Sequence, residues 1–277
     1  MCALLVRLCL TAPMSTPTRA EDLRARARAE MRTAILDAAR RELAEGGAAG
    51  LSVRAVAREV GMASSAVYRY FENRDALLTA LIIDAYDSLG EAVEAAEATV
   101  ARKDLLGRWL QITHSVREWA LRQPTLYALV YGSPVPGYAA PQDTIGPATR
   151  VSRLLTDLLL DTMAAHGSQA PTGPGGDVYP PLTPAAVEGL APAMAFMGPD
   201  ATPEWSTRGL MVWAWLFGTV SFEVFGQLES TVTPQRRAEV FDAEAVRAAG
   251  WIGLPATSTA GSPAVPAAVG AAVQSQR

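Results

Sequence analysis

Hydroxyl and guanidinium side chains gather between residues 64 and 70, at a spacing that would place them on one side of a short helix. If the apolar residues Ala63, Val67 and Phe71 face inward, the polar residues face outward or lie on the flanks. These polar residues are Ser64, Ser65, Tyr68, Arg69 and Tyr70. Serine and tyrosine hydroxyls suit phosphates and base edges, and arginine can form a two-pronged pair with guanine. The segment therefore predicts a surface that reads the DNA major groove.

Two short helices are predicted to position this surface. Ser52 is an N-cap candidate, and apolar residues follow it at helical spacing: Val53, Val56, Ala57 and Val60. Gly61 ends this helix, and after a short turn residues 64–70 are predicted to form the next one. Two short helices joined through a glycine are typical of a helix-turn-helix, whose second helix enters the major groove. A helical hairpin that merely exposes polar residues is the alternative.

Longer helices are predicted on both sides of this pair. One runs from Glu21 to Glu45 and stops at Gly46 and Gly47, where glycine can take the left-handed cap. Asn73 is predicted to cap another, which continues to about Thr99. Although the chain's net charge is −4, residues 19–75 carry 11 arginines against 9 acidic residues. A basic front half favours contact with nucleic acid.

At these residues the sequence resembles the TetR/AcrR family of bacterial transcriptional regulators. The resemblance rests on Leu51-Ser52, Val56-Ala57, Val60-Gly61 and the run Val67-Tyr68-Arg69-Tyr70-Phe71-x-Asn73-Arg74-Asp75-x-Leu77. It implies an all-α homodimer in which each subunit has a three-helix DNA-binding head and a larger helical body that binds a small molecule. We therefore expect an extension at residues 1–19, the head at 20–72, the body at 73–254 and a disordered tail at 255–277.

The resemblance also implies roles for individual residues. Phosphate contacts are expected at Ser52, Tyr68 and Arg74. Contacts with bases and nearby sugars are expected at Arg54, Ser64, Ser65, Arg69 and Tyr70. Position 66 departs from the family, which often has a small polar residue or glycine there. Ala66 can offer only an apolar contact, for example to a thymine methyl group.

Helical periodicity continues through the rest of the chain, and strand signals are absent. The predicted helices are 104–121, 124–131, 149–165, 184–197, 204–228 and 234–249. Several begin with proline, which suits the first helical turn. Residues 132–147 and 167–184 are rich in proline and glycine and are predicted to be loops. The expected fold is all-α, with a helix-turn-helix head and a helical domain for ligand binding and dimerisation.

Two segments of this body, Arg122 to Tyr138 and Trp213 to Gly226, resemble a TetR subgroup that carries a Trp-x-x-x-His-Gly pattern. Here Phe217 stands where that pattern has histidine, and Trp213 and Gly218 are retained. The two resemblances together cover most of residues 22–254. Because phenylalanine removes a polar group, this difference favours an apolar ligand.

The predicted helix 204–228 is apolar nearly all round. One stripe consists of Trp213, Leu216, Phe217, Val220 and Val224, whereas Met211, Trp215, Phe222 and Phe225 lie elsewhere. Such a helix must be buried on more than one side. The core of a monomer could bury it, but packing on the matching helix of a second copy as well as on the chain's own core explains it better. We expect residues 149–165 to take part in this dimer contact. Twofold pairing would match a palindromic operator with half-sites about 34 Å apart, or a multiple of that distance.

Candidate ligand contacts are the aromatic and methionine residues of the body helices, with one histidine as a polar anchor. They are Trp109, His114, Trp119, Tyr127, Tyr131, Met163, Phe196, Met197, Trp213 and Phe217. Together they predict a concave apolar site, although each by itself is more often an ordinary core residue. The two histidines, His114 and His166, have no partner at helical spacing, so neither a metal site nor a cofactor is predicted.

Other classes of protein find little support. Catalysis would need a nucleophile with a base, a carboxylate pair or a metal set, and none occurs at recognisable spacing. Cys2 and Cys9 are the only cysteines, so neither a disulfide framework nor a cysteine-built metal site is expected in the folded body. The longest apolar segment, Gly209 to Phe222, is shorter than the ~20 residues that span a bilayer.

The first residues imitate a secretory signal, but Arg7 interrupts the apolar stretch. We expect Met14 to open the functional chain, a cytoplasmic location and no membrane partner. The leading hypothesis is a transcriptional regulator that binds a double-stranded DNA operator and a small-molecule effector. We expect it to be a repressor. Two alternatives are a helical small-molecule-binding protein or enzyme with an incidental helix-turn-helix, and a helical scaffold that acts by protein contacts alone.

Overall fold

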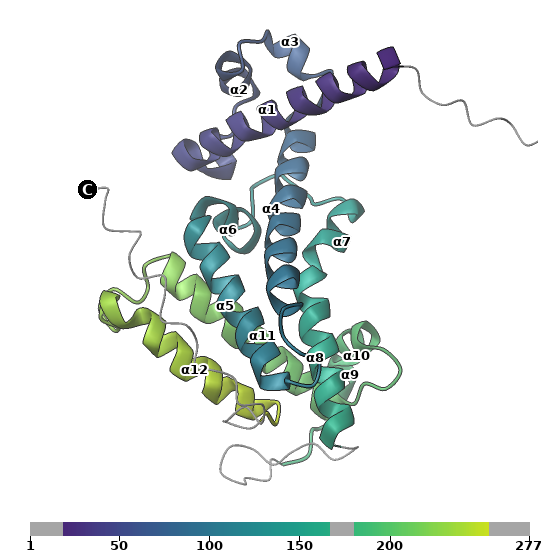
Figure 1. Ribbon diagram of the computed structural model, residues 1–277, viewed down its shortest axis with the longest axis vertical. Helices are drawn as coiled ribbons and strands as arrows, with labels where there is room; N and C mark the ends of the chain where they lie inside the picture. Colours follow the sequence, from purple (N-terminus) through teal and green to yellow (C-terminus); the bar gives the residue numbers. More distant parts are fainter. Residues whose placement is uncertain (1–18, 167–179, 255–277) are drawn as a thin grey trace, which may run out of the picture. The chain divides into compact units, whose positions relative to one another are not determined.

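A computed structural model describes residues 19–166 and 180–254 (Figure 1). Every regular element in these two ranges is a helix, which confirms the all-α fold class. Compact contacts divide the chain into two units, residues 1–77 and 78–277, called here the head and the body. The expectations for the N-terminal extension, for residues 167–179 of the second predicted loop and for the tail lie outside the described residues.

The head contains α1 (Arg19–Gly50), α2 (Val53–Glu59) and α3 (Ser64–Val67). The predicted end of the first helix is visible within α1, because Gly47 has a φ of 65° and leaves the helical backbone. As predicted, the Ser52 side chain caps α2, where it accepts a hydrogen bond from the backbone N–H of Ala55. Residues from all three helices form the core of the head: Ile35, Ala38, Ala39, Leu43, Val53, Val56, Ala57 and Val67.

Helix α3 is shorter than predicted. Tight turns follow it, in which the backbone N–H groups of Tyr70 and Phe71 both donate to the carbonyl of Val67, at 2.9 and 3.1 Å. Val67 and Phe71 are buried as expected. The inward placement of Ala63 was wrong: it is exposed, because it is the extended N-cap residue of α3 and not part of its inner face.

Helix α4 (Arg74–Glu97) starts in the head and continues into the body. The side-chain oxygen of Asn73 accepts from the backbone N–H of Ala76 at 2.8 Å, as the predicted cap requires. The expected domain boundary at residue 73 and the division after Leu77 both fall at the beginning of this helix.

The body continues with further helices, and those predicted at 104–121, 124–131, 149–165 and 234–249 have bounds close to the predicted ones. They are α5 (Leu105–Arg122), α6 (Pro124–Tyr131), α7 (Ile145–Ala148), α8 (Arg150–His166), α9 (Pro184–Gly189), α10 (Ala191–Met197), α11 (Pro203–Val224) and α12 (Arg237–Trp251), with short 3-10 turns η1 (Gln142–Thr144) and η2 (Pro234–Arg236). Asp104 caps α5 and Thr202 caps α11 through their side chains.

Three predictions for the body helices were wrong. Residues 184–197 form two helices that meet at Leu190, since Pro192 has no N–H to continue a single hydrogen-bond ladder. Helix α11 stops at Val224, and Gly226 at φ 74° takes the left-handed conformation that ends helices. The segment 132–147, predicted to be a loop, contains η1 and most of α7.

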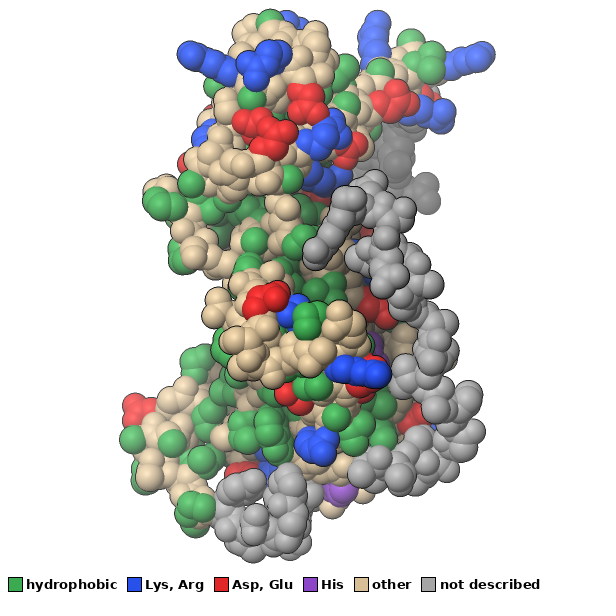
Figure 2. Space-filling view, turned by 90° about the vertical axis from the view of Figure 1, so that its left-hand side faces the viewer, with side chains coloured by type: hydrophobic (Ala, Val, Ile, Leu, Met, Phe, Trp, Pro, Cys, Tyr) green, Lys and Arg blue, Asp and Glu red, His purple; other side chains and the backbone are tan. Residues whose placement is uncertain are grey.

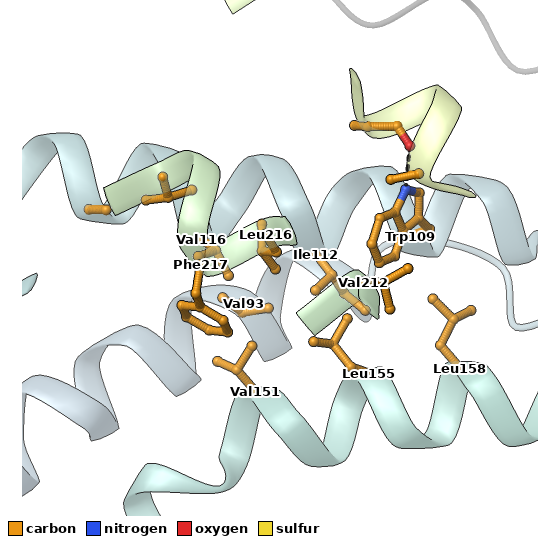
Figure 3. Close-up of a cluster of buried hydrophobic side chains, with 14 of the residues drawn as sticks. Val93, Trp109, Ile112, Val116, Val151, Leu155, Leu158, Val212, Leu216 and Phe217 are labelled. Carbon is orange, nitrogen blue, oxygen red and sulfur yellow. Dashed lines mark hydrogen bonds between the residues drawn. The ribbon is translucent and has the colours of Figure 1, made fainter. Parts of the chain in front are cut away.

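The body's hydrophobic core lies between α5, α8, α11 and α12 (Figure 3). Ile112 and Val116 of α5 face Leu155 of α8 and Leu216 of α11. The indole N–H of Trp109 crosses to α12, where it donates to the carbonyl of Ala245 at 2.8 Å. The buried side chain thus has its polar atom satisfied, as a stable core requires.

One arginine side chain links α8 to α4 within the body through hydrogen bonds. Arg150 donates to both carboxylate oxygens of Glu94 at 2.8 and 2.6 Å and to Asp87 at 2.9 Å. These hydrogen bonds lower the pKa of Glu94. Gly90 lies between the two carboxylates on α4, and a Cβ there would come within 2.5 Å of the Arg150 side chain. The glycine therefore leaves the space that the arginine occupies.

Candidate nucleic-acid interface and body cavities

The predicted recognition residues divide into an exposed and a half-buried set. The exposed set consists of Arg54, Ser65, Tyr68 and Arg69. Tyr68, directly after α3, is 49% exposed. Ser52, Ser64, Ala66, Tyr70 and Arg74 are half-buried. Arginine side chains project from the surface of the head in Figure 2, at the top of the view. The head thus presents hydroxyl and guanidinium groups to solvent, where a phosphate or a base edge could meet them.

Arg74 has a structural task that its assignment to phosphate contact did not include. Its guanidinium donates to three backbone carbonyls, two in the last residues of α1 and one just after it: those of Ala48 at 2.7 Å, Ala49 at 3.1 Å and Leu51 at 3.0 Å. A planar guanidinium with five N–H groups suits such a cluster of carbonyls. Arg74 therefore fastens the start of α4 to the turn that precedes the helix-turn-helix.

Replacing Arg74 with alanine is expected to lower the free energy of unfolding by about 1–3 kcal/mol, because three carbonyls lose a charged donor. Urea unfolding followed by circular dichroism measures this change. Arg58→Ala, which removes an exposed arginine of α2, serves as the control and should change stability little. Wild-type stability for Arg74→Ala would show that these hydrogen bonds contribute nothing.

Two arginines of α1 support the recognition segment and were not predicted to do so. The Arg28 guanidinium donates to the carbonyl of Arg69 at 3.1 Å and lies 5.4 Å from the ring centre of Tyr70. Arg32 lies 4.5 Å from the ring centre of Phe71. Their spacing of four residues places both on one face of α1, and this was the signal in the sequence that could have revealed them.

The ten predicted ligand residues do not come together in one site. Trp109 and His114 lie against α12, where His114 Nε2 is 2.8 Å from Asp242. Tyr131 stacks on Phe217 with ring centres 4.4 Å apart, and Tyr127 donates to the carbonyl of Phe217 at 3.1 Å. The Trp119 indole donates to Ser88. Met163 packs on the outside of the core. The remaining three, Phe196, Met197 and Trp213, line a cavity.

That cavity has a volume of about 500 Å³ and lies between α8, α9, α10 and α11. A second cavity of about 440 Å³ lies between α4, α6, α7 and the turn after α6. In the second, the hydroxyl of Tyr138 is already bonded to Thr79 at 2.8 Å and that of Tyr86 to the carbonyl of Val130 at 3.3 Å. Thr149, at the junction of α7 and α8, lines both cavities.

Tyr127 and Tyr131 of α6, which belong to the aromatic cluster around Phe217, carry no charge at neutral pH. Burial raises the pKa of Tyr127 to about 12, even though a hydrogen bond with Ser221 acts in the opposite direction. Burial also raises the pKa of Tyr131, with the neighbouring tyrosines adding to the effect. Both phenols therefore stay protonated and offer a cation no ionised partner.

Comparison with known proteins decides the family to which this arrangement belongs. Residues 35–81 match the bacterial regulatory proteins of the tetR family, and residues 109–248 match the tetracyclin repressor-like C-terminal domain. The chain belongs to the TetR family of transcriptional regulators. Its regulators bind DNA operators and small-molecule effectors and are dimeric.

Several relatives of this TetR-family chain share most of its length. The HTH-type transcriptional regulators Mb1846 of Mycobacterium bovis and Rv1816 of Mycobacterium tuberculosis are each 39% identical to it over 219 residues, which cover 79% of this chain and 90% of theirs. The crystal structure of SCO4313 is 32% identical with a TM-score of 0.65, and the match covers 85% of this chain and 100% of that one.

A more distant solved structure shares the fold alone. FadR from Bacillus subtilis, solved in complex with stearoyl-CoA, is 13% identical with a TM-score of 0.50, covering 78% of this chain and 98% of that chain. The relatives and the family are transcriptional regulators, which confirms that the function is not catalysis. The subgroup with the Trp-x-x-x-His-Gly pattern is not tested by these matches and stays a prediction. None of the helices within residues 19–166 and 180–254 is both long and apolar enough to cross a lipid bilayer.

Proposed function

We propose that this protein is a ligand-responsive repressor that binds a palindromic operator as a homodimer and leaves it when a mostly apolar molecule binds the body. The main support for DNA binding is that Ser65, Tyr68 and Arg69 are exposed on one short recognition segment. Arg28 and Arg32 of α1 contact this segment through the Arg69 carbonyl and the Phe71 ring. Such a segment suits direct reading of base edges. The site of action would be the cytoplasm, where the operator is accessible.

The homodimer is supported by an unburied apolar face of α11. Met211 and Phe222 are exposed, and with Gly218 they lie on the side of α11 that points away from the body's core. We call these three residues the outer face. A Cβ added to Gly218 would meet no atom within 4 Å, so a second helix could approach closely there. Pairing two such faces would leave less apolar surface in water and give twofold symmetry.

Measurements with the full chain test operator binding and repression. Selection from random double-stranded DNA is expected to enrich an inverted repeat, and fluorescence anisotropy should show affinity for it falling steeply between 50 and 200 mM salt, as bound phosphates release counterions. A reporter promoter carrying the selected repeat should be silenced by the protein. Enrichment of a site without twofold symmetry would contradict the dimeric reading, and activation of the reporter would contradict repression.

A further inference from the structure

The cavity between α8 and α11 has a wall chemistry that restricts what it can hold. Apolar side chains line it from three helices, and hydroxyl side chains line it as well. The apolar ones include Leu155 and Leu159 of α8, Val212 and Trp213 of α11, and Phe196 and Met197 of α10, and the hydroxyl residues are Thr149, Ser152, Thr156 and Ser206. None of the described residues that line it is charged. Its volume of about 500 Å³ lies in the range of small-molecule pockets. A charged group placed there would lose its hydration without gaining a partner.

Of the four hydroxyl residues that line the cavity, Ser206 is the buried one and provides a polar anchor. Ser206 of α11 is 1% exposed, and its hydroxyl donates to the sulfur of Met197 at 3.4 Å. A thioether sulfur is a weak acceptor, so an oxygen atom in the cavity would be a better partner for this hydrogen. The hydroxyl oxygen can also accept from a donor on a bound molecule. One uncharged oxygen-bearing group is therefore what this position can recognise.

The two short helices on one side of the cavity, α9 and α10, pack loosely against the body. Helices α9 and α10, which lie beside α8 in Figure 1, have no buried residue of their own. Phe196 is 45% exposed and Trp213 is 41% exposed, although both face the cavity. A bound apolar molecule would remove part of these rings from water, which favours binding in proportion to the apolar area covered.

Glycine keeps the floor of the cavity open where two helices come close. A Cβ at Gly209 of α11 would lie 2.9 Å from a methyl carbon of Leu159 on α8. Any larger residue there would push Leu159 aside or project into the same space.

From these observations we propose that the cavity binds a neutral amphiphile, with a hydrocarbon body against α8, α10 and α11 and one hydroxyl or carbonyl oxygen on Ser206. The assignment of this molecule as the effector rests on the proposed function, whereas the binding site itself does not. The outer face of α11 is a different surface, so a second copy of the chain is not the occupant proposed here.

The test uses the full chain and a neutral fluorescent probe, N-phenyl-1-naphthylamine, displaced by three ten-carbon molecules. We expect 1-decanol to displace the probe at concentrations at least tenfold lower than decanoate or decylammonium. Ala193→Trp, which fills the cavity from α10, should weaken probe binding at least tenfold. Ala195→Trp, an exposed position of the same helix outside the cavity lining, is the matched control and should bind the probe like the wild type.

Ser206→Ala addresses the polar anchor separately. It should lower the affinity for 1-decanol about three- to tenfold, which corresponds to the loss of one hydrogen bond. The affinity for the saturated hydrocarbon decane should stay unchanged. Equal or stronger displacement by decanoate would overturn the proposal, as would unchanged probe binding by Ala193→Trp. Probe binding that disappears when the protein dimerises would assign the cavity to the second copy instead and would also overturn it.

Operator affinity of the ligand-free variants separates this proposal from the proposed function. Ala195→Trp should bind the selected operator like the wild type, because this exposed position of α10 lies outside both the cavity lining and the recognition segment. If 1-decanol binds with the expected preference while no DNA sequence is selected, the cavity assignment stands and the repressor assignment fails. If DNA is selected but decanoate is preferred, the reverse holds.

Discussion

Phe222→Asp is expected to convert the dimer into a folded monomer and to reduce operator affinity by about a hundredfold or more. Phe222 is 56% exposed and is the most exposed side chain of the outer face, so its replacement by aspartate leaves the charge in water in the monomer. In the dimer the same charge would be buried against apolar side chains without a partner, which is costly. Loss of the second half-site removes the gain from bivalent binding, which reaches factors of roughly 10²–10⁴.

Sedimentation velocity and anisotropy on the selected operator measure the two effects. Leu121→Asp introduces the same charge at an exposed apolar position of α5 and should leave both unchanged if the interface is on α11. Val220→Asp, chosen from the predicted apolar stripe, has a different outcome because Val220 is 0% exposed in the body's own core. We expect this substitution to unfold the body, so it cannot be used to test dimerisation. A dimeric Phe222→Asp protein would refute the assigned face.

Arg69→Ala is expected to weaken binding to the selected operator by about 1–3 kcal/mol and to relax the base preference at one position of each half-site. The Arg69 side chain is exposed, and its backbone carbonyl accepts from Arg28, which holds the backbone at this position and leaves the side chain in contact with solvent. Removing a two-pronged contact to guanine should raise the Kd for the selected site and change it little for sites altered at that base.

Anisotropy on the selected operator and on single-base variants of it provides this measurement. Arg247→Ala is the matched control, because it removes the same charge from an exposed position of α12 in the body. Unchanged affinity and unchanged base preference for Arg69→Ala would remove this residue from the reading surface. Equal weakening on all sequences would instead make it a phosphate contact.

The sequence determined the local features of this protein. Side-chain caps at Ser52, Asn73 and Asp104 and the proline at position 124 start helices where predicted, because each acts on backbone groups within three residues of itself. The helix-turn-helix was predictable for the same reason, since its glycine turn and its apolar spacing lie within one short segment. Membership of the TetR family followed from that segment and was confirmed by the comparisons.

Which distant residues share a space depends on how the helices pack and could not be predicted from the sequence. Trp213 and Phe217 lie four positions apart on α11 with ring centres 5.5 Å apart, but Trp213 also lines the cavity beside α10, whereas Phe217 is also stacked on Tyr131 of α6. Arg74 reads as a phosphate contact by its place in the motif, but its guanidinium is engaged by the carbonyls of residues 48, 49 and 51. Helical periodicity states which side of a helix is apolar. It cannot state which neighbour covers that side, because this depends on how helices far apart in the chain pack together.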